Sequence, residues 1–198
     1  MMALGLAPAN AQMSLTFTSG SSTTGPYTDS SIPGFISVGF GTTVGSWTLD
    51  GYDAYGPQIL GLPDAIQLFG PGLSTTGSSS LAATLTESGL SAPASGSLAI
   101  VLNAGSYPGE SLTAYINGNE VGTTLTASGT ESVNVSGYTT PFTLKEVLVY
   151  SPDGGELISG NGELNLTASA IPEPTTMTLL LMPIAAGTLR KLRKNHAS

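Results

Sequence analysis

The nine residues at 142–150, FTLKEVLVY, form the longest apolar strand candidate in the chain, and the turn sequence PDGG follows them at 152–155. Outward from this segment, apolar and polar residues alternate in six further stretches, at 13–18, 35–40, 97–102, 111–116, 131–136 and 163–168. Gly, Pro and Asn clusters separate the stretches, as turns separate strands. The pattern predicts an all-β fold of about ten to twelve short strands in two packed antiparallel sheets, a jelly-roll-like β-sandwich.

The composition supports the same fold class. Only 9% of the 198 residues are charged, whereas Gly, Ser and Thr are abundant, and this mixture suits strands and turns better than amphipathic helices. No segment before residue 175 has helical periodicity. Once the two ends are set aside, about 155 residues remain, which is enough for one domain with a hydrophobic core. We therefore expect a single β-sandwich domain at 13–169.

Charge is distributed unevenly along the chain. The formal net charge is -8, and Lys145 is the only cation outside the last nine positions. The other four basic residues form a C-terminal cluster of Arg190, Lys191, Arg193 and Lys194. Nucleic-acid binding requires Lys and Arg to displace counterions from the phosphates. The anionic body therefore excludes nucleic acid as a partner, and its acidic surface is expected to serve solubility.

The N-terminal residues resemble the second half of a secretory signal. The stretch MMALGLAPANA at 1–11 is small and apolar, and Ala9-Asn10-Ala11 fits the small-x-small pattern of a signal-peptidase site, with Gln12 as the new N-terminus. A basic n-region and a full apolar stretch are missing. We expect residues 1–12 to be a truncated signal-peptide remnant, with an ordinary flexible terminus as the alternative.

Three ordered features follow the predicted domain, at 170–198. The stretch IPEPT at 171–175 comes first, then the apolar run TMTLLLMPIAAGTL at 176–189, and then the basic cluster. The prolines hold the chain extended, the run is apolar enough to enter a bilayer, and the basic cluster stays cytoplasmic under the positive-inside rule, which places the domain outside. At about 1.5 Å per residue the run spans only about 22 Å of a roughly 30 Å hydrocarbon core, which favours a short, transient transmembrane helix.

The arrangement at 171–194 resembles the PEP-CTERM sorting signal, in which a Pro-Glu-Pro box precedes a short transmembrane helix and an Arg-rich end. The resemblance implies that an exosortase, a membrane cysteine transpeptidase of bacteria that make extracellular polysaccharide, recognises Pro172, Glu173 and Pro174. The body is similar to a generic exported β-sandwich found ahead of such tails, a type with no common activity to transfer. Pro183 in the apolar run and the mixture of Lys with Arg depart from the family pattern. A simple C-terminal tail anchor is the alternative.

The sequence carries few groups for catalysis. It has no cysteine, and its one histidine, His196, lies beyond the basic cluster, which excludes thiol nucleophiles, a Ser-His-Asp triad and a histidine metal site in the body. A carboxylate pair for glycoside hydrolysis stays open, although acids in turns are usually solvated turn formers. The available acids are Asp29, Asp50, Asp53, Asp64, Glu87, Glu110, Glu120 and Glu131. We expect that the protein is not an enzyme and that it needs no cofactor.

One glycine-bounded stretch, DGYDAYG at 50–56, could bind a ligand. Its tyrosines could stack on a sugar ring and its carboxylates could offer oxygens to calcium, which makes the candidate residues Asp50, Tyr52, Asp53 and Tyr55. The alternative is an ordered loop whose tyrosines cover the edge of the sandwich. This alternative is favoured, because calcium needs about six or more oxygens and the sequence has no repeated Asp-rich loop.

Four further residues can be placed from their neighbours. Trp47, the sole tryptophan, lies at an alternating position and is expected in the core. Asn117-Gly118 predicts a tight hairpin, since both residues accept positive φ. Lys145 lies in a strand candidate beside Glu146 and is expected to have a cross-strand or solvent role.

Three classes of function fit the sequence. The first is an exported structural protein of the cell envelope, outer surface or extracellular matrix, with an exosortase, the membrane and extracellular polysaccharide as partners. The second is a carbohydrate-binding or adhesive module, which predicts an exposed row of tyrosines on one sheet face or rim. The third is a polysaccharide hydrolase, which would need two acids facing one cleft at about 5 to 10 Å.

Overall fold

The computed structural model describes residues 12–29, 31–60, 65–90, 95–104, 109–138, 141–151 and 158–168. The chain divides after Ala168 into two units, and the described residues all belong to the first, Met1–Ala168. The predicted signal remnant, apart from Gln12, and the predicted sorting signal at 170–198, with its helix, lie outside the described residues. Within the described ranges no helix is long and apolar enough to cross a membrane.

Strands make up nearly all of the described regular structure, so the predicted all-β class is confirmed. The strands are β1 (Gln12–Ser19), β2 (Ser22–Thr28), β3 (Phe35–Val38), β4 (Thr42–Val44), β5 (Trp47–Leu49), β6 (Tyr52–Tyr55), β7 (Ala65–Thr75), β8 (Leu81–Leu90), β9 (Ser95–Ala104), β10 (Glu110–Ile116), β11 (Asn119–Leu125), β12 (Gly129–Ser136), β13 (Phe142–Tyr150) and β14 (Ile158–Ala168). One helical turn, α1 (Pro57–Leu60), lies between β6 and β7. Its four residues are too few to produce a helical period in the sequence.

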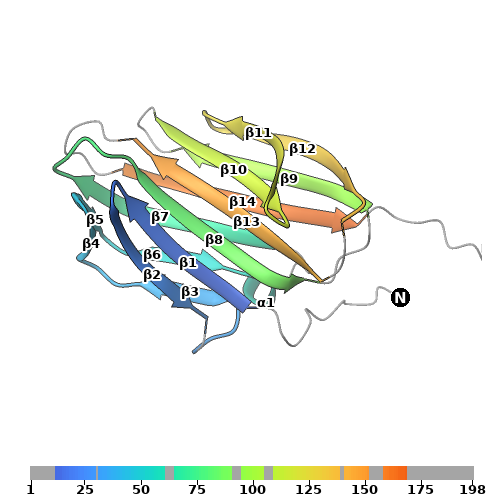
Figure 1. The fold of residues 1–198 in the computed structure, drawn as a ribbon, viewed down its shortest axis with the longest axis horizontal. Coiled ribbons are helices and arrows are strands. Elements are labelled where there is room, and N and C mark those ends of the chain that lie inside the picture. Colours follow the sequence, from blue (N-terminus) through green and yellow to red (C-terminus); the bar gives the residue numbers. More distant parts are fainter. Residues whose placement is uncertain are drawn as a thin grey trace, which may run out of the picture. The chain divides into compact units, whose positions relative to one another are not determined.

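The strands form two antiparallel sheets that pack as a sandwich, as predicted (Figure 1). The smaller sheet has the order β11-β10-β13-β8-β1-β2. The larger sheet begins β12-β9-β14-β7, and both β5 and β6 then pair with the other edge of β7. Beyond them, β4 pairs with β5 and β3 pairs with β6. Strands that are consecutive in the chain often contact each other across the two layers, as β9 and β10, β11 and β12, and β13 and β14 do.

A kinked hairpin explains why the described part of the chain has fourteen strands and not the ten to twelve predicted. Gly39-Phe40-Gly41 separates β3 from β4, and Asp50-Gly51 separates β5 from β6. Gly41 has a φ of 78° and Gly51 a φ of 92°, a backbone region that favours glycine. Two strands of one hairpin are thereby split into four short ones.

The core lies between the sheets and contains the alternate residues that the sequence pattern indicated. Trp47 is fully buried, as predicted, and its indole N–H donates a hydrogen bond of 2.7 Å to the carbonyl oxygen of Ser79. In β13 every second side chain is buried against the other sheet. These inward side chains are Phe142, Leu144, Glu146, Leu148 and Tyr150. One of the five is therefore a carboxylic acid.

The tight turn predicted at Asn117-Gly118 is confirmed between β10 and β11, where the φ angles are 51° and 79°. Asn117 also ties this turn to β13, because its N–H donates to the carbonyl oxygen of Thr143 at 2.9 Å and its Oδ1 accepts from the N–H of Thr143 at 2.8 Å. We expect Asn117→Gly to lower the free energy of unfolding by about 1 kcal/mol, since glycine keeps the positive φ but loses the side-chain bond. Urea denaturation followed by Trp47 fluorescence measures the change. Asn119→Ala in the same hairpin is the control, and an equal loss in both variants would contradict this role of the amide.

Candidate functional site

The stretch predicted to bind a ligand, at 50–55, consists of a kink followed by strand β6. Asp50 lies at the kink, where its N–H donates to the carbonyl oxygen of Gly72 at 2.9 Å. Because successive side chains of a strand point to opposite faces, Tyr52 and Asp53 lie on different sides of the sheet. Tyr52 is fully buried, whereas Asp53 and Tyr55 lie on the outer face. The structure therefore does not bring the four predicted residues together at one site.

Inside the sandwich, Tyr52 belongs to a pair of buried tyrosines. Its hydroxyl is hydrogen-bonded to that of Tyr150 at 2.8 Å, and the two rings meet edge to face with centroids 6.4 Å apart. The Tyr150 hydroxyl also donates to the carbonyl oxygen of Gly160 at 3.5 Å. Burial raises the pKa of both phenols, so both keep their protons. Tyr52 therefore stabilises the contact between the sheets and is not accessible to a sugar or an ion.

The outer face of the larger sheet carries an ordered set of aromatic and polar side chains. The strand register arranges them in two rows that cross β3, β6, β7 and β14. The first row is Phe35, Tyr55, Gln67 and Glu163. The second row is Ser37, Asp53, Phe69 and Asn161. These eight residues are called the aromatic face below.

Rings and hydrogen-bonding groups lie side by side on the aromatic face. The rings of Phe35 and Tyr55 have centroids 5.4 Å apart and are tilted by 40°. The Tyr55 hydroxyl donates to Oδ2 of Asp53 at 3.3 Å, and partial burial together with the Asp53 charge raises the pKa of Tyr55. Phe69, the neighbour of Asp53 in the second row, is 42% exposed. An exposed ring beside a carboxylate and an amide can stack on a ligand whose polar groups those neighbours bind.

The described residues offer no site for a metal ion built from three or more His, Cys, Asp or Glu side chains. The calcium binding considered for the stretch at 50–56 therefore gains no support from the described residues.

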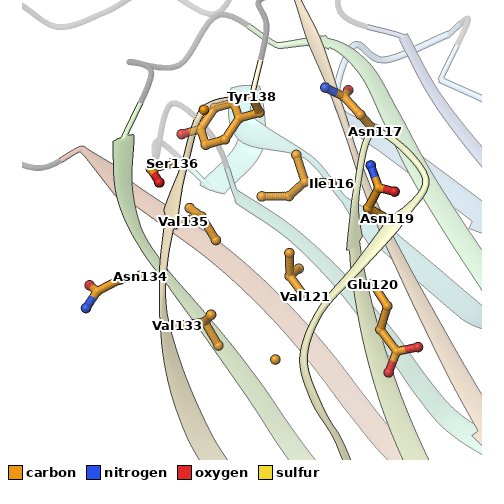
Figure 2. Close-up of a pocket in the computed structure, with 12 residues that line it drawn as sticks. Ile116, Asn117, Asn119, Glu120, Val121, Val133, Asn134, Val135, Ser136 and Tyr138 are labelled. Atoms are coloured by element: carbon orange, nitrogen blue, oxygen red, sulfur yellow. The ribbon is translucent and has the colours of Figure 1, made fainter.

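A hollow of about 680 Å³ lies between the edge strands β11 and β12 (Figure 2). Apolar side chains from both strands and from the end of β10 point into it, namely Ile116, Val121, Val133 and Val135. Figure 2 shows Glu120 and Asn134 pointing away from the hollow, as strand alternation requires. The rim of the hollow also carries polar side chains, namely Asn117, Asn119, Ser136 and Tyr138, so the hollow combines apolar contact with polar groups.

Three glutamates at inward positions of the smaller sheet are buried in the core: Glu87 of β8, Glu110 of β10 and Glu146 of β13. Glycines make room for them. A β-carbon at Gly162 would lie 3.1 Å from Oε2 of Glu146, and one at Gly56 would lie 3.0 Å from Oε2 of Glu87. Neither oxygen of Glu87 or Glu146 has a hydrogen-bond partner among the described residues. Burial raises the pKa of Glu146 well above its usual value, with a smaller contribution from the charge of Glu163.

Glu87 lies near a second acid, Asp29. Burial, followed by the Asp29 charge, raises the pKa of Glu87 to about 7. The Asp29 carboxylate is itself occupied, because it accepts from the N–H of Met13 at 3.3 Å and from the N–H of Gly34 at 2.9 Å. The two acids therefore lie together, but Glu87 is fully buried and Asp29 anchors the backbone.

The remaining acids that the sequence offered for catalysis lie apart from this pair. Glu120 is exposed on β11. Glu131 of β12 accepts from both the N–H and the hydroxyl of Thr123, at 2.9 and 2.8 Å, and so joins the edges of the two sheets. Asp64 lies outside the described residues.

Sequence reasoning did not single out Phe35 and Phe69, although the signal for Phe69 was present. In AIQLFG at 65–70, Phe69 is in phase with Gln67 and out of phase with the buried Ile66 and Leu68. Because alternate residues of a strand point to opposite faces, an aromatic residue that alternates with buried positions is expected to expose its ring. Of the cross-strand and solvent roles predicted for Lys145, the structure shows the cross-strand one, because its Nζ lies 3.8 Å above the ring centroid of its strand neighbour Tyr115.

Fold and site together define an antiparallel β-sandwich domain that displays an aromatic and polar face on its larger sheet. No family model, curated protein or solved structure matches the chain. The functional argument therefore rests on the residues of this chain.

Proposed function

We propose that this chain is an exported protein of the cell envelope or extracellular matrix, sorted through its C-terminal residues and working by non-covalent contact. The observation that carries the proposal is the order of Pro172-Glu173-Pro174, the apolar run at 176–189 and the basic cluster at 190–194. The last strand among the described residues ends at Ala168, and the box follows it after three intervening residues in the sequence. A sorting signal needs this sequence order, because the processing enzyme must act beyond the folded body.

The partners follow from the same segment. An exosortase-type membrane transpeptidase would recognise the Pro-Glu-Pro box, and the membrane would hold the apolar run until processing. Extracellular polysaccharide is the proposed environment of the mature protein. The acidic surface, which has one cation among the described residues, suits a soluble exported domain.

We further propose that the sandwich belongs to the jelly-roll class. The strands from β7 onward support this assignment, because their order is β12-β9-β14-β7 in one sheet and β11-β10-β13-β8 in the other. In this order the chain passes repeatedly from one sheet to the other, as it does in jelly rolls. Because that class includes lectin domains as well as structural ones, the fold permits several functions and selects none.

Sorting makes a definite prediction about the mature C-terminus. In the native host we expect the chain to lose the residues beyond the Pro-Glu-Pro box, and we expect a variant with Pro172, Glu173 and Pro174 all changed to Ala to keep them and stay in the membrane. Intact-mass spectrometry of protein from the envelope and the medium measures both. A full-length tail in both proteins would contradict sorting and leave a plain membrane anchor.

A carbohydrate-binding module is the second candidate function, and the aromatic face is the observation that favours it. Protein surfaces that bind sugars need accessible rings beside hydrogen-bonding groups. The aromatic face meets this requirement with Tyr55, Phe69 and the polar neighbours Asp53 and Asn161. A hydrolase gains no comparable support, because two of its candidate acids, Glu87 and Glu110, lie in the core.

A further inference from the structure

The aromatic face extends across the sheet and is not confined to one strand. Neighbouring strands lie about 4.8 Å apart, so the three steps from β3 to β14 cover about 14 Å. At each strand the two rows present either a ring or a polar side chain to the outside. Such a surface fits an elongated ligand that crosses the strands better than it fits a small compact one.

We propose that the aromatic face binds an uncharged polysaccharide chain that lies across β3, β6, β7 and β14. This inference rests on the carbohydrate-binding function proposed above and adds the course of the ligand across the strands and the ligand class. Tyr55 and Phe69 stack on the apolar faces of sugar rings, where the C–H groups meet the negative face of the aromatic ring. On the two sides of Phe69, the Asp53 carboxylate accepts hydrogen bonds from the sugar hydroxyls and the Asn161 amide N–H donates to them, since Oδ1 of Asn161 is buried.

The Tyr55 ring is held in place before a ligand arrives, and the backbone of Phe69 is held by strand pairing. Tyr55 is fixed by its contact with the Phe35 ring, 5.4 Å away, and by the bond of its hydroxyl to Asp53. Phe69 projects from a central strand that is paired on both sides, with β6 and with β14. A side chain that is ordered in the free protein loses little entropy on binding, so a contact with the Tyr55 ring contributes directly to affinity.

Charge favours an uncharged chain over an anionic one. The charged side chains that the register places on the aromatic face are Asp53 and Glu163, and both are acidic. Lys145, the one Lys or Arg in the described ranges, lies over Tyr115 on the smaller sheet. Carboxylates accept hydrogen bonds from hydroxyls but repel uronate or sulfate groups. The aromatic face therefore selects against acidic polysaccharides.

The test is affinity gel electrophoresis of the full chain, with dextran, hydroxyethyl cellulose or galactomannan cast into the native gel as uncharged probes and alginate as the anionic probe. We expect at least one uncharged probe to retard the protein and alginate not to retard it. Phe69→Thr and Tyr55→Thr should each weaken binding about tenfold, the scale of one lost aromatic contact. Threonine is used because it favours strands, and circular dichroism of each variant checks the fold.

Phe40→Thr is the matched control. Phe40 is 84% exposed in the kink between β3 and β4, outside the aromatic face, so its replacement should leave retardation unchanged. Retardation by alginate alone would overturn the ligand class. A loss of retardation in Phe40→Thr equal to that in Phe69→Thr and Tyr55→Thr would overturn the site. Carbohydrate binding itself would stand in both cases. Retardation by none of the four probes would overturn the inference and the second candidate function together. The mass of the mature chain is a separate measurement, so the sorting proposal is tested independently.

Discussion

The free energy of unfolding is expected to fall by about 3 kcal/mol between pH 4.5 and about pH 7 through Glu87 alone, because burial raises the pKa of this acid from 4.5 to about 7. Below pH 4.5 the folded and unfolded chains both hold this proton, so ionisation of Glu87 does not make stability depend on pH there. Between the two pKa values the unfolded chain releases the proton and the folded chain keeps it, so rising pH favours unfolding. Above about pH 7 both states are ionised, and the folded state carries a buried charge with no hydrogen-bond partner among the described residues.

Urea denaturation of the wild type and of Glu87→Gln at a series of pH values measures this effect. Gln cannot ionise and has nearly the same shape, so the variant should be more stable than the wild type by about 3 kcal/mol at pH 8 and should lose most of that advantage at pH 4. Glu120→Gln, which changes an exposed acid on β11, is the control. Its free energy of unfolding should depend on pH as that of the wild type does. If the free energy of unfolding of Glu87→Gln changed with pH in parallel with that of the wild type, Glu87 would be ionised in the folded protein at neutral pH.

The strand pattern could be predicted from the sequence because alternation depends on local burial. The stretch at 142–150 predicted β13 with its correct bounds, and the Asn117-Gly118 hairpin was found from two residues that accept positive φ. The kinks of the β3 to β6 hairpin were not foreseen. They depend on how two strands share one edge of β7, and this pairing is non-local.

The candidate site was predicted only in part, for a physical reason. Glycines bound the stretch at 50–56, a pattern that predicts a loop, but its core is the strand YDAY, in which alternation sends Tyr52 inward and leaves Asp53 and Tyr55 outside. The aromatic face itself joins residues from four strands that are far apart in the chain. Their adjacency follows from the sheet register, which a single sequence does not encode locally.

The buried glutamates mark another limit of pattern reading. Glu146 lies at one of the inward-facing, otherwise apolar positions of β13. From residue type alone, a glutamate is expected on the surface. The complementary signal lies on β14, where Gly160 and Gly162 face the carboxyl groups of Glu110 and Glu146. Small residues on one sheet opposite large polar ones on the other are recognised only after the sheets are paired.

Glu146→Met should raise the free energy of unfolding by about 2 kcal/mol at pH 7, the second-largest effect expected here. Glu146 is fully buried between Leu144 and Leu148, and neither carboxyl oxygen has a hydrogen-bond partner among the described residues. Methionine has a similar volume, adapts its shape to the space beside Gly162 and removes both unpaired oxygens. Glu146→Gln is the matched comparison, and it should stabilise less, because the amide keeps unpaired polar atoms in the core.

The stability gain from Glu146→Met has two parts, the removal of an ionisable group and the removal of unpaired polar atoms. The pH dependence of the gain separates them. Because burial and the Glu163 charge raise the pKa of Glu146, the wild type loses stability as the pH rises above 4.5, and the gain from Met should grow with it. At pH 4 the gain should shrink to the part that comes from unpaired polar atoms alone. The measurement is urea denaturation at pH 4, 6 and 8. A Met variant that is less stable than the wild type at every pH would show that the Glu146 carboxyl group stabilises the sandwich, as a carboxyl group with a partner in the core would.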